Sequence, residues 1–272
     1  MSVRFTNLLF CKFIAASLLW LMSNNVYSNT YLVGIQQLDY YPHYDLSRSG
    51  DKGIAWHILE QFSRQHNVSF AYIPLPPKRL QLELGKGTID FAYPDNPRWQ
   101  PKDEQPGRNK VFSQGLALGI YGTLVKKEKV GQKLRQFSRL AFPLGFTPVK
   151  WHELITQNGI ETIETYDAMG ALRAVARGRA DGADVEYNVA AYLTSITPDN
   201  IHLVLDPELP FSAVQFSLST FAYPELIEKF NQFLIAEKDQ IEKIKARYRL
   251  KQSIEPRDYY TNEDNLVEHS AK

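Results

Sequence analysis

The sequence predicts an α/β protein whose two similar lobes are joined by two extended strands. The first observation is a repeated unit: residues 87–92 and 178–183 both read Gly-x-x-Asp-x-Ala, and a helix-compatible run precedes each copy. A glycine in the left-handed region ends a helix, and a short strand then carries the chain to its carboxyl end. Open parallel sheets bind ligands at that end. The two copies therefore predict two lobes that face one shared cleft.

The second observation is a pair of long extended segments, one after each copy of the repeated unit. Residues 116–125 contain two glycines within an apolar run, and residues 202–218 form a second extended connection. We interpret the two segments as the crossings of a hinge, so that the chain leaves the first lobe and later returns to it. The predicted division is a first lobe of residues 29–120 and 212–252, a second lobe of residues 121–211 and a polar tail of residues 253–272.

Hydrophobic periodicity and turn residues place the elements within this division. In the first lobe we expect strands at 31–35, 68–73 and 89–93 and helices at 54–67 and 78–86. In the second lobe we expect strands at 140–146 and 161–165, a helix begun by Thr147 and Pro148, and a helix capped by Asp167. A helical repeat over 224–249 is predicted to pack on the first lobe.

Composition and charge limit the kinds of molecule that the protein could bind. The chain has 272 residues, of which 44% are hydrophobic, enough for one or two cores of ordinary size. Its 31 basic and 30 acidic residues are interspersed, so the sequence lacks the basic footprint of a nucleic-acid-binding protein. We expect that the protein has no nucleic-acid partner. We also expect that it is a monomer.

The first 28 residues have the pattern of a secretory signal peptide. Arg4 and Lys12 precede an uncharged apolar run at 13–22, and Val26-Tyr27-Ser28 follows as a cleavage region. A bilayer-spanning helix needs about 20 apolar residues, more than this run supplies. We expect residues 1–28 to be cleaved; the alternative is a buried N-terminal helix.

The residue types argue against a catalytic or metal centre. Cys11 is the only cysteine and lies in the predicted signal peptide, so the mature chain has no thiol for a disulfide, a nucleophile or a metal site. The six histidines never stand at the spacing of zinc ligands, and there is no Gly-x-Ser-x-Gly elbow or phosphate-binding glycine loop. We expect no catalytic residues, no metal and no cofactor.

Short motifs in a fixed order carry a resemblance to a known family. The motifs are Leu32-Val-Gly-Ile, Tyr41-Pro42, Gly53, Gly87-Thr-Ile-Asp90, Phe112-Ser113 and Gly178-Arg-Ala-Asp181. In this order the chain resembles bacterial extracellular solute-binding proteins of family 3, which include the periplasmic receptors of polar amino-acid ABC transporters. The resemblance implies a type II periplasmic-binding fold, a periplasmic location and a ligand closed between the lobes.

The resemblance also implies roles for residues at the predicted cleft. Glu186 looks like the second-lobe acid that holds a ligand ammonium, and Asp184 could share that role. The family's first-lobe Thr-x-x-Arg pattern, whose arginine binds a carboxylate through two hydrogen bonds, is replaced in this chain by residues 94–99, and Arg98 is the candidate stand-in for that arginine. Aromatic residues of the early loop usually enclose the ligand. The candidate ligand-binding residues are Tyr40, Tyr41, Tyr44, Tyr93, Asp95, Arg98, Trp99, Phe146, Thr147 and Glu186.

Structural roles compete with these binding roles. Glu186 could be a solvated acid at a helix start, Arg98 could pair with Asp95 or Asp103, and Trp99 could pack beneath its loop. Some of the early tyrosines could belong to the core. Asp90 and Asp181 are expected to serve as turn and capping residues.

The sequence and the resemblance leave three hypotheses for the function. The favoured one is a periplasmic receptor that captures a small polar solute, amino acids among the candidates, and delivers it to the membrane subunits of an ABC transporter. The second is a periplasmic sensing subunit that signals to a membrane receptor. The third is a dehydratase-like enzyme on the same fold, with Asp95 and Glu186 as an acid pair across the cleft.

Overall fold

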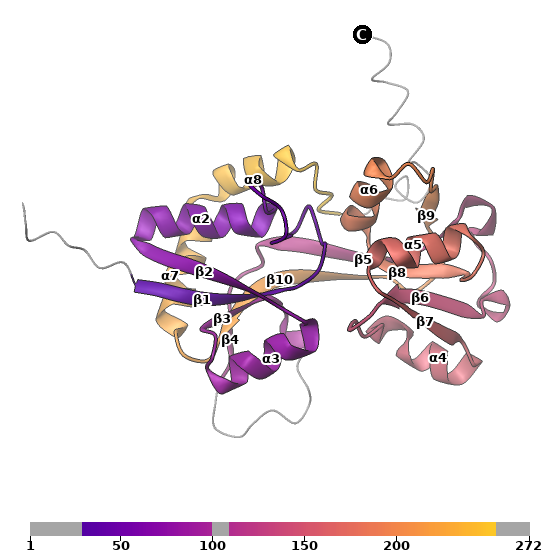
Figure 1. The fold of residues 1–272 in the computed structure, drawn as a ribbon, viewed down its shortest axis with the longest axis horizontal. Helices are drawn as coiled ribbons and strands as arrows, with labels where there is room; N and C mark the ends of the chain where they lie inside the picture. The colour runs from indigo at the N-terminus through magenta and orange to yellow at the C-terminus, as the bar shows by residue number, and fades with distance from the viewer. Residues whose placement is uncertain (1–28, 100–108, 254–272) are drawn as a thin grey trace, which may run out of the picture.

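The computed structural model describes residues 29–99 and 109–253. The predicted signal peptide and all of the predicted tail beyond Ser253 lie outside the described residues. Strands and helices alternate along the chain, and the strands follow one another across a mixed sheet in the order β2-β1-β3-β10-β5-β8-β6-β7. Figure 1 shows two α/β lobes with β5 and β10 running between them. The predicted fold class is confirmed.

The first lobe is built around three parallel strands, β1 (Asn29–Gln36), β2 (Val68–Leu75) and β3 (Phe91–Asp95). Helices α2 (Ile54–His66) and α3 (Pro77–Lys86) lie on opposite sides of this sheet, and α7 (Pro224–Ala236) and α8 (Lys238–Arg247) complete the lobe (Figure 1). The single helical repeat expected over 224–249 is therefore two helices that meet at Glu237.

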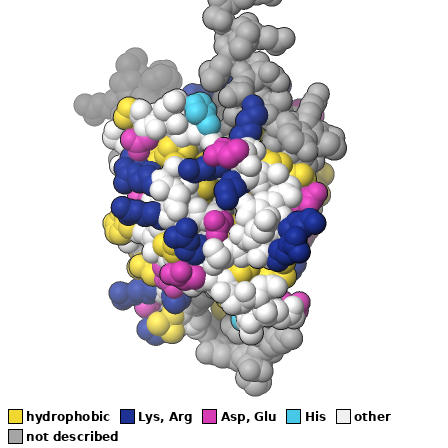
Figure 2. Space-filling model, turned by 90° about the vertical axis from the view of Figure 1, so that its right-hand side faces the viewer, with side chains coloured by type: hydrophobic (Ala, Val, Ile, Leu, Met, Phe, Trp, Pro, Cys, Tyr) yellow, Lys and Arg dark blue, Asp and Glu magenta, His cyan; other side chains and the backbone are white. Residues whose placement is uncertain are grey.

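The second lobe repeats the arrangement with β6 (Arg139–Pro143), β7 (Glu161–Thr165) and β8 (Gly182–Glu186), which are parallel to one another. Three helices cover them: α4 (His152–Asn158), α5 (Ala168–Ala176) and α6 (Tyr187–Ile196). Figure 2 shows the end of the molecule on this side, where basic and acidic side chains are interspersed.

The sequence predicts two helix starts in the second lobe, one at Asp167 and one at Thr147 and Pro148. The first prediction is confirmed and the second is wrong. Asp167 caps α5 as expected, because its Oδ1 accepts a hydrogen bond from Gly170 N at 2.7 Å. Thr147 and Pro148 do not start α4. A 3₁₀ turn at Val149–Trp151 comes first, and Trp151 occupies the cap position of α4 without a side-chain hydrogen bond.

Strands β5 (Ala117–Lys126) and β10 (Ser212–Thr220) join the lobes. They pair with each other in antiparallel register from Tyr121 with Ser212 to Ala117 with Phe216. β10 also pairs with β3 of the first lobe, and β5 pairs with β8 of the second. The second extended segment is not one strand: β9 (Leu203–Leu205) pairs with β5, and a turn separates it from β10.

The largest hydrophobic core runs through both lobes. Val33 and Ile58 belong to it on one side, Leu172 and Val185 on the other, and Ile120 of β5 lies between. A smaller cluster around Trp151 fills the space under α4. The short two-residue strand β4 (Val111–Phe112) pairs with β10 at the first lobe and leads into β5.

Candidate functional site

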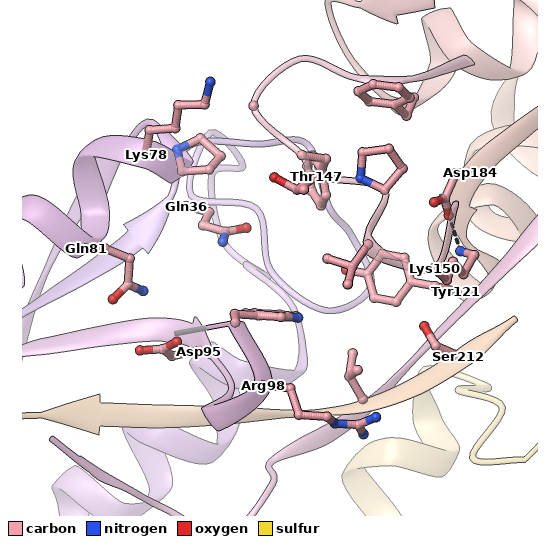
Figure 3. Close-up of a pocket in the computed structure, with 18 of the residues that line it drawn as sticks. Gln36, Lys78, Gln81, Asp95, Arg98, Tyr121, Thr147, Lys150, Asp184 and Ser212 are labelled. Carbon is pink, nitrogen blue, oxygen red and sulfur yellow. Dashed lines mark hydrogen bonds and ion pairs between the residues drawn. The ribbon is translucent and has the colours of Figure 1, made fainter. Parts of the chain in front are cut away.

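A cavity of about 660 Å³ lies where the two lobes face each other. The first lobe contributes residues from α3, β3 and the 3₁₀ turn η1 (Pro97–Trp99), and the second contributes the segment after β6 and Asp184 from the middle of β8. The two hinge strands form part of its wall (Figure 3). Its polar and charged lining residues are Gln36, Lys78, Gln81, Asp95, Arg98, Lys110, Tyr121, Thr147, Lys150, Asp184 and Ser212.

An ion pair between Asp95 and Lys110 forms the first-lobe wall. Lys110 Nζ lies 2.7 Å from Asp95 Oδ2, and the side chains are 5% and 2% exposed. Asp95 also accepts hydrogen bonds from Ser219 Oγ at 2.6 Å and from the backbone N–H of Asn96 at 2.8 Å. Because β3 ends at Asp95, the strand delivers this carboxylate to the cavity with its acceptors already engaged.

A second ion pair, between Lys150 and Asp184, forms the wall on the second lobe (Figure 3). Both side chains are almost buried, and Lys150 Nζ also lies 5.6 Å from the ring centroid of Tyr121. Burial lowers the pKa of Lys150, and the charge of Asp184 and its hydrogen bond oppose that shift. The two lobes therefore each present a lysine–aspartate pair to the cavity.

Two further cations stand on the first lobe. Lys78 is exposed near the start of α3. Arg98 lies on η1 and donates a hydrogen bond from Nη2 to the backbone oxygen of Ala213 at 2.9 Å. Within the described residues, neither cation forms an ion pair with a carboxylate.

Apolar side chains line the remainder of the cavity. Trp99, 37% exposed, contributes from η1, and Phe146 contributes from the loop after β6. Val149 is 64% exposed at the second-lobe side, and Val214 belongs to the hinge strand β10. The cavity thus combines charged residues from both lobes with apolar side chains.

Five of the ten candidate residues line this cavity: Asp95, Arg98, Trp99, Phe146 and Thr147. Arg98 does not pair with Asp95, since Asp95 is bonded to Lys110. Asp103 lies outside the described residues. The other five candidates do not line the cavity: Tyr40, Tyr41, Tyr44, Tyr93 and Glu186.

Glu186 is fully buried at the interface of the hinge with α6. Its Oε1 accepts hydrogen bonds from Ile120 N at 2.9 Å and Asn188 Nδ2 at 3.0 Å, and its Oε2 accepts one from Val189 N at 2.8 Å. His43 Nε2 lies 3.1 Å from the same Oε2. Glu186 stands at a helix start, as the alternative expected, but it is buried and not solvated. The binding expectation also differs from the structure, because the carboxylate caps α6 and faces the interior.

The early tyrosines are mostly core residues. Tyr40, Tyr44 and Tyr93 are at most 2% exposed, and burial raises the pKa of each phenol. Tyr40 donates to Tyr121 Oη at 3.0 Å and stacks on Phe146, so it supports the cavity wall from behind.

Tyr41 lies away from the cavity in a contact between the lobes. Its ring packs against Tyr192 of α6, and its hydroxyl donates to Asp51 Oδ2 at 3.1 Å. The guanidinium of Arg48 lies 4.1 Å from the Tyr41 ring centroid and donates to Tyr192 Oη at 2.9 Å. These contacts give Tyr41 a structural role where ligand contact was expected.

Sequence reasoning missed Lys78, Lys110 and Lys150 as cavity residues. Lys150 could have been found, because it follows closely after the candidate Thr147. Lys78 follows the proline pair that starts α3 after β2. Lys110 stands in a polar stretch without a periodic pattern, so only its place beside Asp95 reveals it.

The described parts of the chain contain no cluster of three or more His, Cys, Asp or Glu residues that could hold a metal ion. The acid pair proposed for a dehydratase-like reaction does not form either, since Glu186 lies outside the cavity that Asp95 lines. Over residues 29–99 and 109–253, none of the helices has the length and apolar character needed to cross a bilayer.

Known proteins resemble this chain in their three-dimensional structure, whereas the sequence comparisons found no match. No protein-family model matches the sequence, and no curated protein matches it. Among solved structures, an arginine transport-system periplasmic binding protein from Legionella pneumophila superposes with a TM-score of 0.65 at 14% identity, over 81% of this chain and 100% of that one.

Two other solved structures are similar to a comparable degree. A histidine kinase sensor domain with similarity to periplasmic binding proteins has a TM-score of 0.65 at 18% identity, over 81% of this chain and 96% of that one. An ancestral amino acid-binding protein, a precursor of cyclohexadienyl dehydratase, has a TM-score of 0.62 at 18% identity, over 81% and 95%. The chain has the fold of the type II periplasmic binding proteins.

Proposed function

We propose that this protein is an exported, monomeric receptor that captures a small polar solute between its lobes in the periplasm and delivers it to an ABC transporter. The observation that carries the proposal is the cavity between the lobes, which charged residues line from both sides. A solute that touches both walls favours the closed arrangement, because only that arrangement provides all of its contacts.

The size and lining of the cavity suit a small molecule. Small-molecule sites are clefts of roughly 300–1,000 Å³ with a few placed polar groups on a mostly apolar surface. The cavity falls in this range, at about 660 Å³. Its lysine–aspartate pairs are nearly buried, and the Lys110–Asp95 pair is also bonded to Gln81, Ser219 and Asn96, so they offer a preorganised polar surface that requires little reordering when a solute binds.

The test is a thermal-shift screen of the mature protein against amino acids, amines and organic acids, followed by small-angle scattering with each hit. We expect a hit to raise the melting temperature and to reduce the radius of gyration, since binding to the folded state stabilises it and closure makes it more compact. If no solute shifts the melting temperature, the proposal is wrong.

A sensing role is the second candidate, favoured by the likeness to the histidine kinase sensor domain. Sensing and transport share the closing cleft and differ in the membrane partner. Pull-down of the solute-loaded protein with membrane extracts, followed by mass spectrometry, separates them: transporter subunits support the first proposal, and a receptor kinase supports the second.

A further inference from the structure

The described lining of the cavity carries more positive than negative charge. It contains four cations and two acids, a formal excess of two positive charges. The cations are Lys78, Arg98, Lys110 and Lys150, and the acids are Asp95 and Asp184. Within a cleft from which closure excludes water, like charges repel more strongly than in bulk solvent, so this lining favours an anionic occupant.

Both acids already have cationic partners. Asp95 accepts from Lys110, Ser219 and the backbone of Asn96, and its side chain is 2% exposed. Asp184 is paired with Lys150. A ligand ammonium would have to compete with a buried lysine for either carboxylate and would add to the positive excess. The cavity therefore disfavours an ammonium group.

Counting only partners among the described residues, the two buried lysines keep hydrogen-bonding capacity for a ligand. A lysine ammonium has three donors. Among the described residues, Lys110 contacts Asp95 and also donates to Gln81 Oε1 at 2.5 Å, while Lys150 donates to Asp184. Lys110 is 5% exposed and Lys150 is 11% exposed, and they belong to opposite lobes. A ligand with an acceptor group at each end would accept the remaining hydrogen bonds of both lysine ammonium groups.

The positions of these groups define the shape of such a ligand. Figure 3 shows Asp95 and Lys78 on one side of the cavity and the Lys150–Asp184 pair on the other. The apolar side chains of Trp99 and Phe146 also line the cavity. A ligand with an anionic group at each end and a hydrocarbon middle matches cations on opposite walls together with these apolar side chains.

We propose that the cleft selects small dicarboxylates that carry a hydrocarbon spacer and no ammonium group. One carboxylate binds on the first lobe, in the field of Lys110, Lys78 and Arg98, and the other binds Lys150 of the second lobe. This inference rests on the proposed solute-binding function and names its substrate class. It also makes Arg98 and Lys150 the residues that determine specificity.

The experiment compares each dicarboxylate with its 2-amino derivative by isothermal titration calorimetry at fixed ionic strength. The pairs are succinate with aspartate, glutarate with glutamate, and adipate with 2-aminoadipate, and 1,5-diaminopentane is the cationic probe. We expect one dicarboxylate to bind, its amino derivative to bind about tenfold or more weakly, and the diamine not to bind. The weakening is expected because the added ammonium would lie near the excess positive charge and would find each acid of the described lining already paired with a lysine.

Two variants test the assigned cations. Arg98→Gln removes a first-lobe charge. The double variant Lys150→Gln with Asp184→Asn replaces the buried second-lobe pair by a neutral pair of similar shape, so neither charge is left alone. Each is expected to weaken dicarboxylate binding about tenfold or more. The matched control is Arg79→Gln, because Arg79 neighbours Lys78 on α3 but is 65% exposed, pairs with Glu83 and does not line the cavity.

The outcomes separate this inference from the function on which it rests. If an amino derivative binds as tightly as its dicarboxylate, or if only a different class of solute binds, the selectivity for dicarboxylates is wrong and the solute-binding function stands. Unchanged dicarboxylate affinity in Arg98→Gln and in the double variant overturns the assigned cations. If no solute of any class binds the wild-type protein, both proposals are wrong.

Discussion

Glu186 illustrates how a buried carboxylate organises the region around the hinge. Its two oxygens accept hydrogen bonds from the backbone of β5, from the start of α6 and from Asn188. His43 of the first lobe contacts the same carboxylate. One side chain thus links both lobes and a hinge strand, and its loss would leave buried donors without an acceptor.

We predict that Glu186→Gln destabilises the protein by about 1–3 kcal/mol, because one carboxylate oxygen becomes an NH₂ group that faces N–H donors. Chemical denaturation monitored by circular dichroism measures the change. Glu164→Gln is the matched control, since Glu164 is exposed on β7. Equal stability of the two variants would contradict the bonding described for Glu186.

The aspartates of the repeated unit have equivalent structural roles. Asp90 Oδ2 accepts from Leu32 N at 2.7 Å, and Asp181 Oδ2 accepts from the backbone N–H groups of Ser138 and Arg139 at 2.9 Å each. Asp90 therefore tethers the middle of β1, and Asp181 tethers the start of β6. Both roles are structural, although the carboxylates bind strand backbone and do not cap a helix as expected, and neither residue lines the cavity.

Asp181 gives a pH-dependent prediction. Partial burial raises its pKa, but the hydrogen bonds from Ser138 and Arg139 outweigh burial and hold the pKa below the ordinary value. A depressed folded pKa contributes stability above the unfolded pKa, which is about 4, and this contribution is lost as the pH falls through the folded pKa.

We therefore expect Asp181→Asn to be less stable than wild type at neutral pH and to lose less stability on acidification below about pH 4. Urea denaturation at a series of pH values measures the difference. Parallel pH curves for the two proteins would show that Asp181 does not contribute in this way.

At the scale of elements, the repeated unit depends on a helix that ends in the left-handed conformation. Gly87 ends α3 with φ 74°, and Gly178 follows α5 with φ 70°. The space around Gly178 is open, with no atom within 4 Å of where a Cβ would stand. The requirement for glycine there is conformational, since no neighbour excludes a side chain.

Alanine at these glycines should reveal that requirement. Gly178→Ala is expected to cost roughly 1–2 kcal/mol, the penalty of a left-handed residue with a side chain. Gly85→Ala is the control: it lies inside α3 and its surroundings are also open, so alanine should stabilise the protein by about 0.5–1 kcal/mol. Thermal denaturation of both variants tests the contrast, and the same sign for both would overturn it.

At the scale of the whole molecule, the lobes are joined by more than two strands. The largest core contains side chains from both lobes and from β5 and β10. Tyr40 of the first lobe bonds to Tyr121 of β5, and Arg48 bonds to Tyr192 of α6. The shared core and these hydrogen bonds couple the stability of one lobe to that of the other.

We predict that the protein unfolds in one cooperative transition, with equal calorimetric and van't Hoff enthalpies. Differential scanning calorimetry measures both quantities. Two resolved transitions would mean that the lobes unfold independently despite the shared core. A bound solute should move the single transition to higher temperature without splitting it.

Much of the architecture could be predicted from local patterns. The repeated Gly-x-x-Asp-x-Ala unit, the strand at 161–165 and the cap at Asp167 depend on backbone conformation and on contacts between near neighbours, which the sequence states directly. The two-lobe fold followed because each repeat could be assigned to one lobe and the extended segments to the connections between them.

The sequence by itself determined the fold class, the repeated unit and five residues of the cavity wall: Asp95, Arg98, Trp99, Phe146 and Thr147. Only the tertiary structure decided that Glu186 faces the interior and that Tyr40 supports the cavity wall from behind. It also decided that each lobe has its own lysine–aspartate pair, Lys110 with Asp95 and Lys150 with Asp184. The physical reason is that a pattern along the chain fixes local conformation. The direction of a side chain at the end of a strand, and its charged partner, depend on segments that are distant in sequence and meet only when the lobes are packed.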